Sequence, residues 1–443
     1  MGTTTEAPGR GRQLLRRLRL SELRARRAVR FLSRPPEGWT APTEVERALY
    51  EAKLRGDRAV YVRALAQADL YHPNDRAEAD AGRYYIRPVE NPVGRGRAVP
   101  VRTEGRLSAP GNRSVYFAEG LGGWADLLDG YRATCLVVNP GSPCEAFLPA
   151  RAFDRRFWRA LAGEVDVDAR RGRLRWATAG GEQHGRTAHG LACGALLSVV
   201  NGEVWNSLAW HGDGYDAEKR RLADWWDVTD RESWRTTTAH LLEPGSGSRA
   251  WTFVLDVRRS LAQERGGDVD TGVWRRGVEN ALRAGAAEEA SSYVLTAEGV
   301  TAPEPVDTEV LDAEVAGARR LVERISRYEA RFRADGLLPE GGWVRNVEAW
   351  NYGRAVHVAR WGVGARYCGQ DEAGHLVRRA GELCRVAYNS WEQLAAGHVL
   401  GRCLHFDEEE FGDWYHEMRK AHQVLTTHPQ SPWRTLSFSR LGH

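Results

Sequence analysis

Lysine and long apolar runs are scarce in this sequence of 443 residues. Only Lys53, Lys219 and Lys420 are lysines, against 60 arginines, which we interpret as the mark of a bacterial genome rich in G and C. No uninterrupted apolar run approaches the roughly 20 residues that a membrane-spanning helix requires, so we expect no transmembrane segment. The basic N-terminal stretch is not followed by an apolar segment, so we expect no secretory signal.

Paired cysteines are missing too. The six cysteines are scattered, and no two of them form a Cys-x-x-Cys pair: Cys135, Cys144, Cys193, Cys368, Cys384 and Cys403. In a long chain of this kind they are expected to be free thiols in a reducing compartment, so we predict a cytoplasmic protein. Hydrophobic residues make up 42% of the chain, which excludes wholesale disorder and allows packed cores in two or three domains.

The familiar motifs of catalytic and cofactor sites are absent. The sequence contains no Gly-x-Ser-x-Gly elbow, no phosphate-binding P-loop and no Gly-x-Gly-x-x-Gly turn. His189 and Cys193 would share a helix face, but no second pair of ligands follows, and a structural zinc site requires four. We therefore expect no metal and no cofactor, and catalysis is the less favoured function.

The net charge of +4 is unevenly distributed. Residues 1–40 contain ten arginines and three glutamates, a balance of +7, so the remainder of the chain sums to 4 − 7 = −3. Because the chain after residue 40 has a net charge close to zero, its charge gives no reason to expect nucleic-acid binding. The segment Arg10–Arg34 has partly helical spacing of its apolar residues. One interpretation is an arm that binds anionic lipid, nucleic acid or a protein partner. The other is a solvated, partly frayed N-terminal helix.

Periodicity divides the chain into an N-terminal mixed part and a C-terminal helical part. We predict an α+β protein with a basic arm, a small mixed α/β domain, a connector and a mainly α-helical domain, at residues 1–40, 41–150, 151–186 and 187–443. The mixed domain should contain a helical stretch over Glu44–Asp69, and then four strands. The expected strands are Tyr84–Val89, Val99–Thr103, Ser114–Ala118 and Thr134–Val138.

The order of segments in the mixed domain resembles a known family. An "ALYEA" helix, the stretch "YVRALAQADLYHP", the strand "SVYFAE" and "CLVVNPGSP" follow one another as in the N-terminal domain of SseB-like proteins. The resemblance covers about residues 44–150, and the turn "NPGSP" after an apolar strand is its best signature. It implies a small α+β domain without established catalytic residues.

The C-terminal part resembles the bacterial domain-of-unknown-function family 1266 over about residues 190–438. The segments that carry this resemblance are "LADWWDVTDRESW", "EAWNYGRAVHVARWGVGARYC", "NSWEQLAAGHVLGRCLHF" and "HPQSPWRTL". Members of the family typically have Trp-Asp where this chain has Trp350-Asn351. Any function of the family that requires a carboxylate at position 351 is therefore not expected in this chain.

Two expected helices place polar side chains on apolar stripes. Asn351 and Arg354 fall on the stripe of one helix, and Trp391, His398 and Arg402 share a face of another, which Ser390 and Gln393 begin as a capping box. A buried arginine needs an acid or a cleft, because an unpaired buried charge is costly. The candidate acids are Asp224, Asp227 and Asp230. The arginines either form an ion-pair network that fixes helix register or line a pocket for an anion, walled by tryptophans.

Three functions from different classes are compatible with this pattern. The first is a non-catalytic, adaptor or immunity-like protein with a protein partner, because tryptophan (17 residues) and arginine are enriched at binding hot spots. The second is an enzyme or small-anion binder that uses an Arg/His-lined cleft around Arg354, His398 and Arg402. The third is a membrane-surface or nucleic-acid binder acting through Arg10–Arg34. We rank the interaction protein first.

Overall fold

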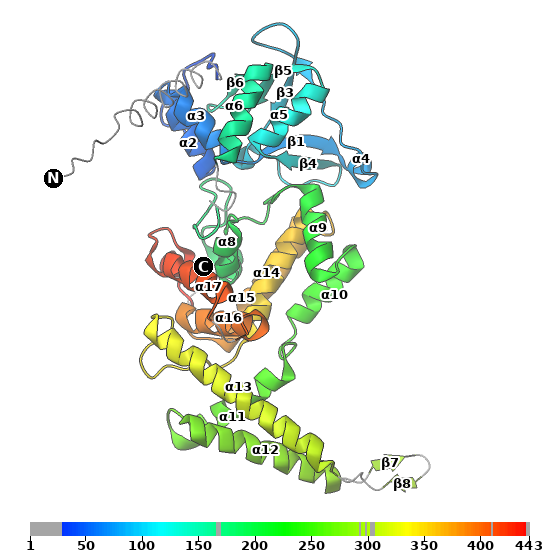
Figure 1. Cartoon of the computed structure of the whole chain (residues 1–443), viewed down its shortest axis with the longest axis vertical. Helices are drawn as coiled ribbons and strands as arrows, with labels where there is room; N and C mark the ends of the chain where they lie inside the picture. The colour runs from blue at the N-terminus through cyan, green and yellow to red at the C-terminus, as the bar shows by residue number, and fades with distance from the viewer. Residues whose placement is uncertain are drawn as a thin grey trace, which may run out of the picture. The chain divides into compact units, whose positions relative to one another are not determined.

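The computed structural model shows an α+β protein, as predicted: strands are mostly N-terminal and helices dominate the rest (Figure 1). It describes residues 29–164, 170–291, 294–296, 299–301, 306–408 and 411–439. The predicted basic segment Arg10–Arg34 lies outside the described residues up to position 28. Within the described ranges, no helix is long and apolar enough to cross a membrane.

The chain divides into two compact units. Unit 1 contains residues 1–183, 201–234 and 358–374, and unit 2 contains residues 184–200, 235–357 and 375–443. The residues of four helices are shared between the two units: α8 (Ala195–Asn201), α10 (Arg231–Leu241), α14 (Glu348–Gly364) and α15 (Gln370–Ala387).

Unit 1 is built on two small sheets. The first has the strand order β2-β3-β5-β6, in which β3 and β5 are parallel and the other pairs are antiparallel. The second pairs β1 with β4 in an antiparallel ladder. The bounds are β1 Leu70–Asp75, β2 Val89–Glu90, β3 Arg97–Val101, β4 Ser114–Glu119, β5 Ala133–Val138 and β6 Ala146–Pro149.

Helices cover the first sheet and close the core of unit 1 (Figure 1). Trp124 and Trp158 are fully buried between these helices and the strands, where each large ring removes apolar surface from water. The helices are α2 (Glu44–Leu54), α3 (Arg58–Ala66), α5 (Leu121–Gly130) and α6 (Ala152–Gly163). Short α4 (Arg76–Asp80), the 3-10 turn η1 (Glu104–Arg106) and α9 (Tyr215–Trp226) complete the regular structure wholly within unit 1.

The helical stretch predicted over Glu44–Asp69 is in fact two helices. Gly56 adopts φ +68°, and the Asp57 side chain accepts hydrogen bonds from the amides of Ala59 and Val60 at the start of α3. A left-handed glycine followed by an N-cap aspartate ends one helix and begins the next. The apolar residues have helical spacing on both sides of this break, so periodicity alone does not reveal it.

The strand predictions are partly right. Three of the four expected strands are found, within a few residues of the expected bounds, as β3, β4 and β5, whereas Tyr84–Val89 contributes only its last residue, Val89, to β2. Strands β1 and β6 were not predicted. β1 contains Pro73, which removes a backbone donor and breaks the strand signal, although a proline is tolerated here because β1 is an edge strand of a two-stranded sheet.

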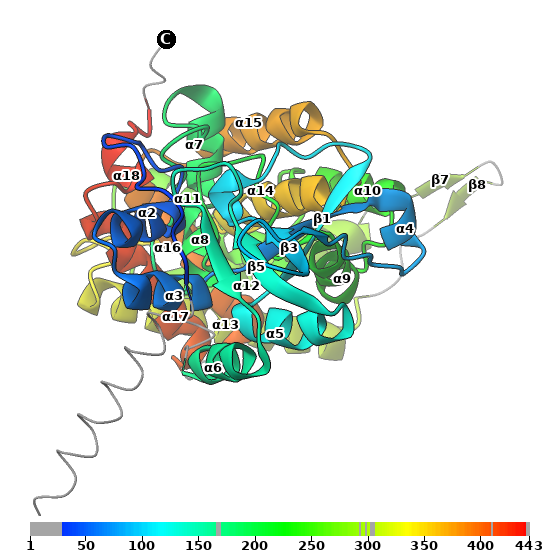
Figure 2. The same ribbon diagram turned by 90° about the horizontal axis from the view of Figure 1, so that it is seen from above.

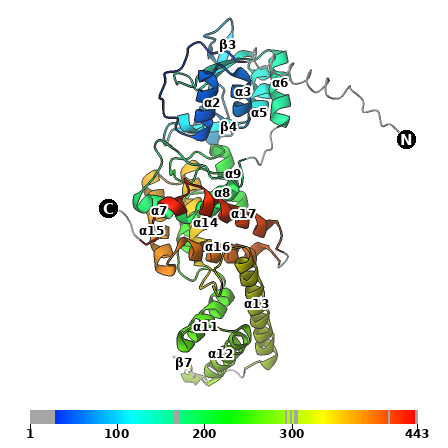
Figure 3. The ribbon, with the colours of Figure 1, turned by 90° about the vertical axis from the view of Figure 1, so that its left-hand side faces the viewer.

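Unit 2 is a helical assembly in which α11, α12 and α13 pack as one group (Figure 3). α16 packs against both α17 and α13. The remaining bounds are α7 Gly185–Cys193, α11 Arg249–Arg265, α12 Thr271–Ser291, α13 Thr308–Ala334, α16 Trp391–Phe406, α17 Asp413–Thr427 and α18 Pro432–Thr435. A short hairpin, β7 (Val294–Thr296) with β8 (Gly299–Thr301), lies between α12 and α13 in the sequence.

Candidate functional site

The part of α14 in unit 2 holds the first predicted pair, Asn351 and Arg354. The Asn351 amide group donates to Ser246 Oγ at 3.0 Å, and its Oδ1 accepts a short hydrogen bond from the Arg354 guanidinium. This contact helps to hold the Arg354 guanidinium over the Trp350 ring, 4.4 Å from the ring centroid. Asn351 therefore positions Arg354 on an aromatic face, where a cation–π contact stabilises the charge.

The predicted capping box at the start of α16 is present in a changed form. Ser390 Oγ accepts from the Gln393 amide at 3.2 Å, but the Gln393 side chain accepts from the amide of Asn389 rather than that of Ser390. The cap fixes where α16 begins and so sets the face that carries His398 and Arg402.

His398 is fully buried and neutral. Its Nδ1 lies 3.1 Å from the carbonyl oxygen of Ala349, which can only accept, so Nδ1 carries the proton. Burial, reinforced by the charges of Arg402 and Arg354, lowers the pKa of His398 to about 3. α14 can approach this ring because position 353 is glycine: a Cβ there would lie 2.7 Å from the imidazole. His398 is thus a packing residue between α14 and α16.

Arg402 lies almost entirely inside unit 2, with 6% of its surface exposed. Its Nη2 pairs with Glu417 Oε2 at 3.1 Å, and its guanidinium is 4.7 Å from the Trp414 ring centroid and 6.0 Å from that of Trp350. Burial lowers the pKa of Arg402, and the charge of Glu417 opposes that shift. Arg402 therefore has an acid partner on α17 and aromatic neighbours on α14 and α17.

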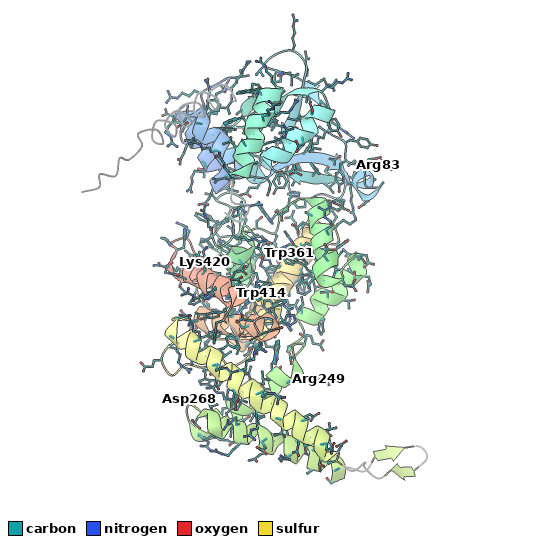
Figure 4. The ribbon with its side chains drawn as sticks, viewed as in Figure 1. Arg83, Arg249, Asp268, Trp361, Trp414 and Lys420 are labelled. Carbon is teal, nitrogen blue, oxygen red and sulfur yellow. The ribbon has the colours of Figure 1, made fainter. Side chains whose placement is uncertain are left out.

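Two of the aromatic rings at this cluster are open to solvent. Phe406 and Trp414 are 41% and 42% exposed and stack with ring centroids 4.9 Å apart at an interplanar angle of 22° (Trp414 is labelled in Figure 4). We define the arginine–tryptophan surface as Trp350, Arg354, Arg402, Phe406 and Trp414. It combines a half-buried cation, Arg354, and a buried one, Arg402, with the exposed rings of Phe406 and Trp414. Arginine and tryptophan are enriched at binding hot spots.

Trp391 belongs to a different part of unit 2. Its ring stacks on Trp433 at 5.8 Å and an 11° interplanar angle, and its Nε1 donates to the Leu436 carbonyl at 3.0 Å. Both rings are almost fully buried. Trp391 therefore packs α16 against the C-terminal helix α18, and it is not part of the arginine–tryptophan surface.

Asp227 is an exposed residue of unit 1. It ends α9 in the left-handed conformation, with φ +53°, and Asp224 and Asp230 are exposed beside it in the sequence. The acid that Arg402 pairs with is instead Glu417. The structure thus brings together Asn351, Arg354, His398 and Arg402 of the predicted set, and it places Trp391 and Asp227 elsewhere.

A buried charge network in unit 1 was not predicted. Arg221 pairs with Glu218 at 2.8 Å and with Asp213, and Arg360 pairs with Glu203 at 3.2 Å. The Arg221 guanidinium also lies 5.3 Å from the centroid of the Trp361 ring, which is labelled in Figure 4. The i, i+3 spacing of Glu218 and Arg221 was the only periodic signal of this network in the sequence. Asp213 lies in the loop before α9, and Arg360 and Glu203 are 157 positions apart.

Glu218 makes the stability of unit 1 depend on pH. Burial raises its pKa to about 8, with Arg221 opposing the shift. Between about pH 5 and about pH 8 the folded state therefore retains a proton that the unfolded chain has lost, so the free energy of unfolding falls as pH rises, by up to about 1.4 kcal/mol per pH unit. We expect Glu218→Gln to reduce this slope in urea unfolding series, whereas exposed Glu232→Gln should not. If the free energy of unfolding depends on pH equally in the unchanged protein and in both variants, Glu218 is not the group responsible.

Comparison with known proteins gives a match for the C-terminal part. Residues 221–438 match the model of a family described as "Protein of unknown function (DUF1266)", which confirms the predicted resemblance over those residues. The match includes every residue of the arginine–tryptophan surface. The SseB-like resemblance of residues 44–150 is not supported by a family match and stays a prediction. No curated protein and no solved structure matches the chain.

Proposed function

We propose that this protein is a non-catalytic interaction protein of the adaptor or immunity-like kind, and that its arginine–tryptophan surface binds an acidic segment of a protein partner. The observation that carries the proposal is the packing of Arg354 and Arg402 on aromatic rings of which two, Phe406 and Trp414, remain exposed. A few residues supply most of the binding free energy of a protein interface, and tryptophan, tyrosine and arginine are enriched among them.

Charge favours an acidic partner. Burial lowers the pKa of Arg354 to about 10 and lowers that of Arg402, which indicates that both guanidinium groups have lost solvation. A carboxylate of a partner would compensate this loss, because charge-assisted hydrogen bonds to guanidinium are short and strong. The stacked rings of Phe406 and Trp414 offer an apolar contact beside the charges.

The alternative of an enzyme with an Arg/His-lined cleft has less support. A general base must reach the proton that it abstracts, but His398 is fully buried, with its Nδ1 proton directed at the Ala349 carbonyl. Arg402 is engaged by Glu417. Removing an exposed aromatic ring distinguishes a small-anion binder from the proposed protein binder. The substitution should leave the affinity for a small anion unchanged and should weaken binding of a protein segment.

The proposal predicts opposite effects of two substitutions in one ion pair. Glu417 competes for Arg402, so Glu417→Gln should strengthen binding of an acidic segment, and Arg402→Gln should weaken it by about tenfold, or about 1.4 kcal/mol. The probe is a displayed library of random peptides, in which we expect enrichment of Asp and Glu next to aromatic residues. Affinities of the selected peptides are then measured by calorimetry for each variant.

Two further variants keep this test decisive. Trp414→Ala removes an exposed ring and leaves both arginines in place, so it should weaken peptide binding even if Arg402→Gln disturbs folding. Arg419→Gln lies on the same helix as Glu417, is exposed and should leave the affinity unchanged. The proposal is wrong if the selected peptides are not acidic, if Glu417→Gln weakens binding as much as Arg402→Gln, or if Trp414→Ala has no effect.

The remaining assignments are part of the same proposal. Residues 44–150 would form an SseB-like domain, and the protein would act in the bacterial cytoplasm. Free cysteines support a reducing compartment: all six thiols are unpaired and buried. The order of α2, α3, β4 and β5 supports the SseB-like assignment, since these elements hold the four segments on which the resemblance depends.

A further inference from the structure

Unit 1 contains a cavity that the arginine–tryptophan surface does not include. Its volume is about 420 Å³, within the range of small-molecule sites. It is bounded by α2, the end of α3, the start of α5, the end of α6 and the segment 170–175. Figure 2 shows α5 beside α6, as their mutual packing requires.

The apolar lining residues of the cavity are mostly alanines, which we call the alanine wall, together with Val45 and Leu121. Its members come from α2, α3 and α6 or lie close to their ends: Ala48, Ala64, Ala66, Ala68 and Ala162. Short side chains leave room inside the cavity and present apolar surface. A ligand body that packs there should therefore be compact and aliphatic.

The lining also contains charged residues, and two of its arginines already have partners. Arg170 pairs with Asp69, whose carboxyl pKa is raised by burial. Arg175 pairs with Glu104 at 2.5 Å and also donates to the Gly202 carbonyl. These bonds hold the backbone on both sides of Arg173, the third arginine of the lining, whose side chain is exposed to solvent.

Among the described residues, Arg173 and Glu119 are the charged members of the lining without an ion-pair partner. In the part of the chain that the structure describes, Arg173 has no hydrogen bond or ion pair, and Glu119 accepts one hydrogen bond, from the Gly120 amide at 3.1 Å. The third acid of the lining, Glu44, pairs with Arg47 at 3.1 Å outside the cavity. One cation and one anion are thus left for a ligand.

We propose that this cavity binds a small zwitterion, with its carboxylate on Arg173, its ammonium group on Glu119 and a short aliphatic body against the alanine wall. The lining contains three arginines and three acids, Arg170, Arg173, Arg175, Glu44, Asp69 and Glu119. A ligand with only an anionic group meets three carboxylates there, and one with only a cationic group meets three guanidinium groups. A ligand that carries both charges satisfies both free side chains.

Three compounds with the same branched body test this inference on the full chain. Leucine carries both charged groups, 4-methylpentanoate only the carboxylate and 3-methylbutylamine only the ammonium group. We expect leucine to bind saturably in calorimetry and to raise the melting temperature, and the other two to bind at least about tenfold more weakly. Equal binding of either single-charge compound, or no binding of leucine, would overturn the proposal.

Variants locate the site. Arg173→Gln and Glu119→Gln should each weaken leucine binding by about tenfold, and Ala48→Leu, which fills the cavity, should abolish it. Arg156→Gln, an exposed change on α6, is the matched control and should have no effect. Leucine binding that survives Ala48→Leu with unchanged affinity would place the site elsewhere. Because peptide binding at the arginine–tryptophan surface is measured separately, either proposal can fail without the other.

Discussion

Replacing Arg258 by alanine is expected to destabilise unit 2 by about 3–5 kcal/mol, the usual cost of breaking a buried ion pair. Arg258 on α11 forms two hydrogen bonds to the Glu329 carboxylate on α13, at 2.8 and 2.7 Å, and both side chains are buried. Its guanidinium also lies 4.6 Å from the Trp274 ring centroid and 5.0 Å from that of Trp343. The variant leaves Glu329 without its cation in the interior.

Hydrogen exchange of α11 and α13 and urea unfolding measure this effect. Burial raises the pKa of Glu329 while Arg258 opposes the shift, so we also expect the variant to lose further stability as pH rises. The control is Arg259→Ala, which breaks an exposed pair with Asp256 and should cost less than about 1 kcal/mol. Similar losses in the two variants would show that the buried pair has no special role. Arg258→Met combined with Glu329→Leu should recover much of the stability.

Gly190→Ala is expected to have the second large effect. A Cβ at position 190 would lie 2.1 Å from the carbonyl oxygen of Val377, and one at Gly381 would lie 2.9 Å from the Gly190 Cα, so α7 and α15 touch through their backbones here. The obstacle is main chain rather than a flexible side chain, so α15 has to shift. Overpacking of this kind costs typically about 1–3 kcal/mol, and a backbone clash falls at the upper end.

Gly285→Ala is the matched control for this prediction. Gly285 lies within α12, and a Cβ at this position would have nothing within 4 Å, so alanine is tolerated there. Because alanine has the higher helix propensity, Gly285→Ala should stabilise α12 by about 0.5–1 kcal/mol. The two substitutions are chemically identical but have opposite expected signs in thermal or urea unfolding. Destabilisation by both, or by neither, would contradict the close crossing of α7 and α15.

The sequence predicted helices well where one apolar stripe is long. The 4-and-3 spacing from Leu311 to Phe332 predicts a packed helix, and α13 spans Thr308–Ala334 with Val315, Val322 and Phe332 buried. The same reasoning placed Arg402 on an inward face of α16. It could not supply the partner, because Glu417 lies on α17 and its side chain is brought to Arg402 only by the packing of the two helices.

Residues that meet across long sequence separations were not predictable. Arg360 and Glu203 are 157 positions apart and are paired in unit 1, and Arg170 reaches Asp69 across 101 positions. No periodicity links such positions, since each belongs to a different element. The cavity between α2, α3, α5 and α6 has the same origin: alanines that look like ordinary helix formers become a wall only after the helices pack.

The most direct test of the proposed function places a photo-crosslinking benzoylphenylalanine at position 414 in cells that express the protein from its own locus. We predict a crosslink to an acidic segment of one protein, which Arg402→Gln removes and Glu417→Gln strengthens. The control places the same group at position 225, an exposed tryptophan of unit 1, where this crosslink should not form. No specific crosslink at position 414, or one that is unchanged by Arg402→Gln, would contradict the account.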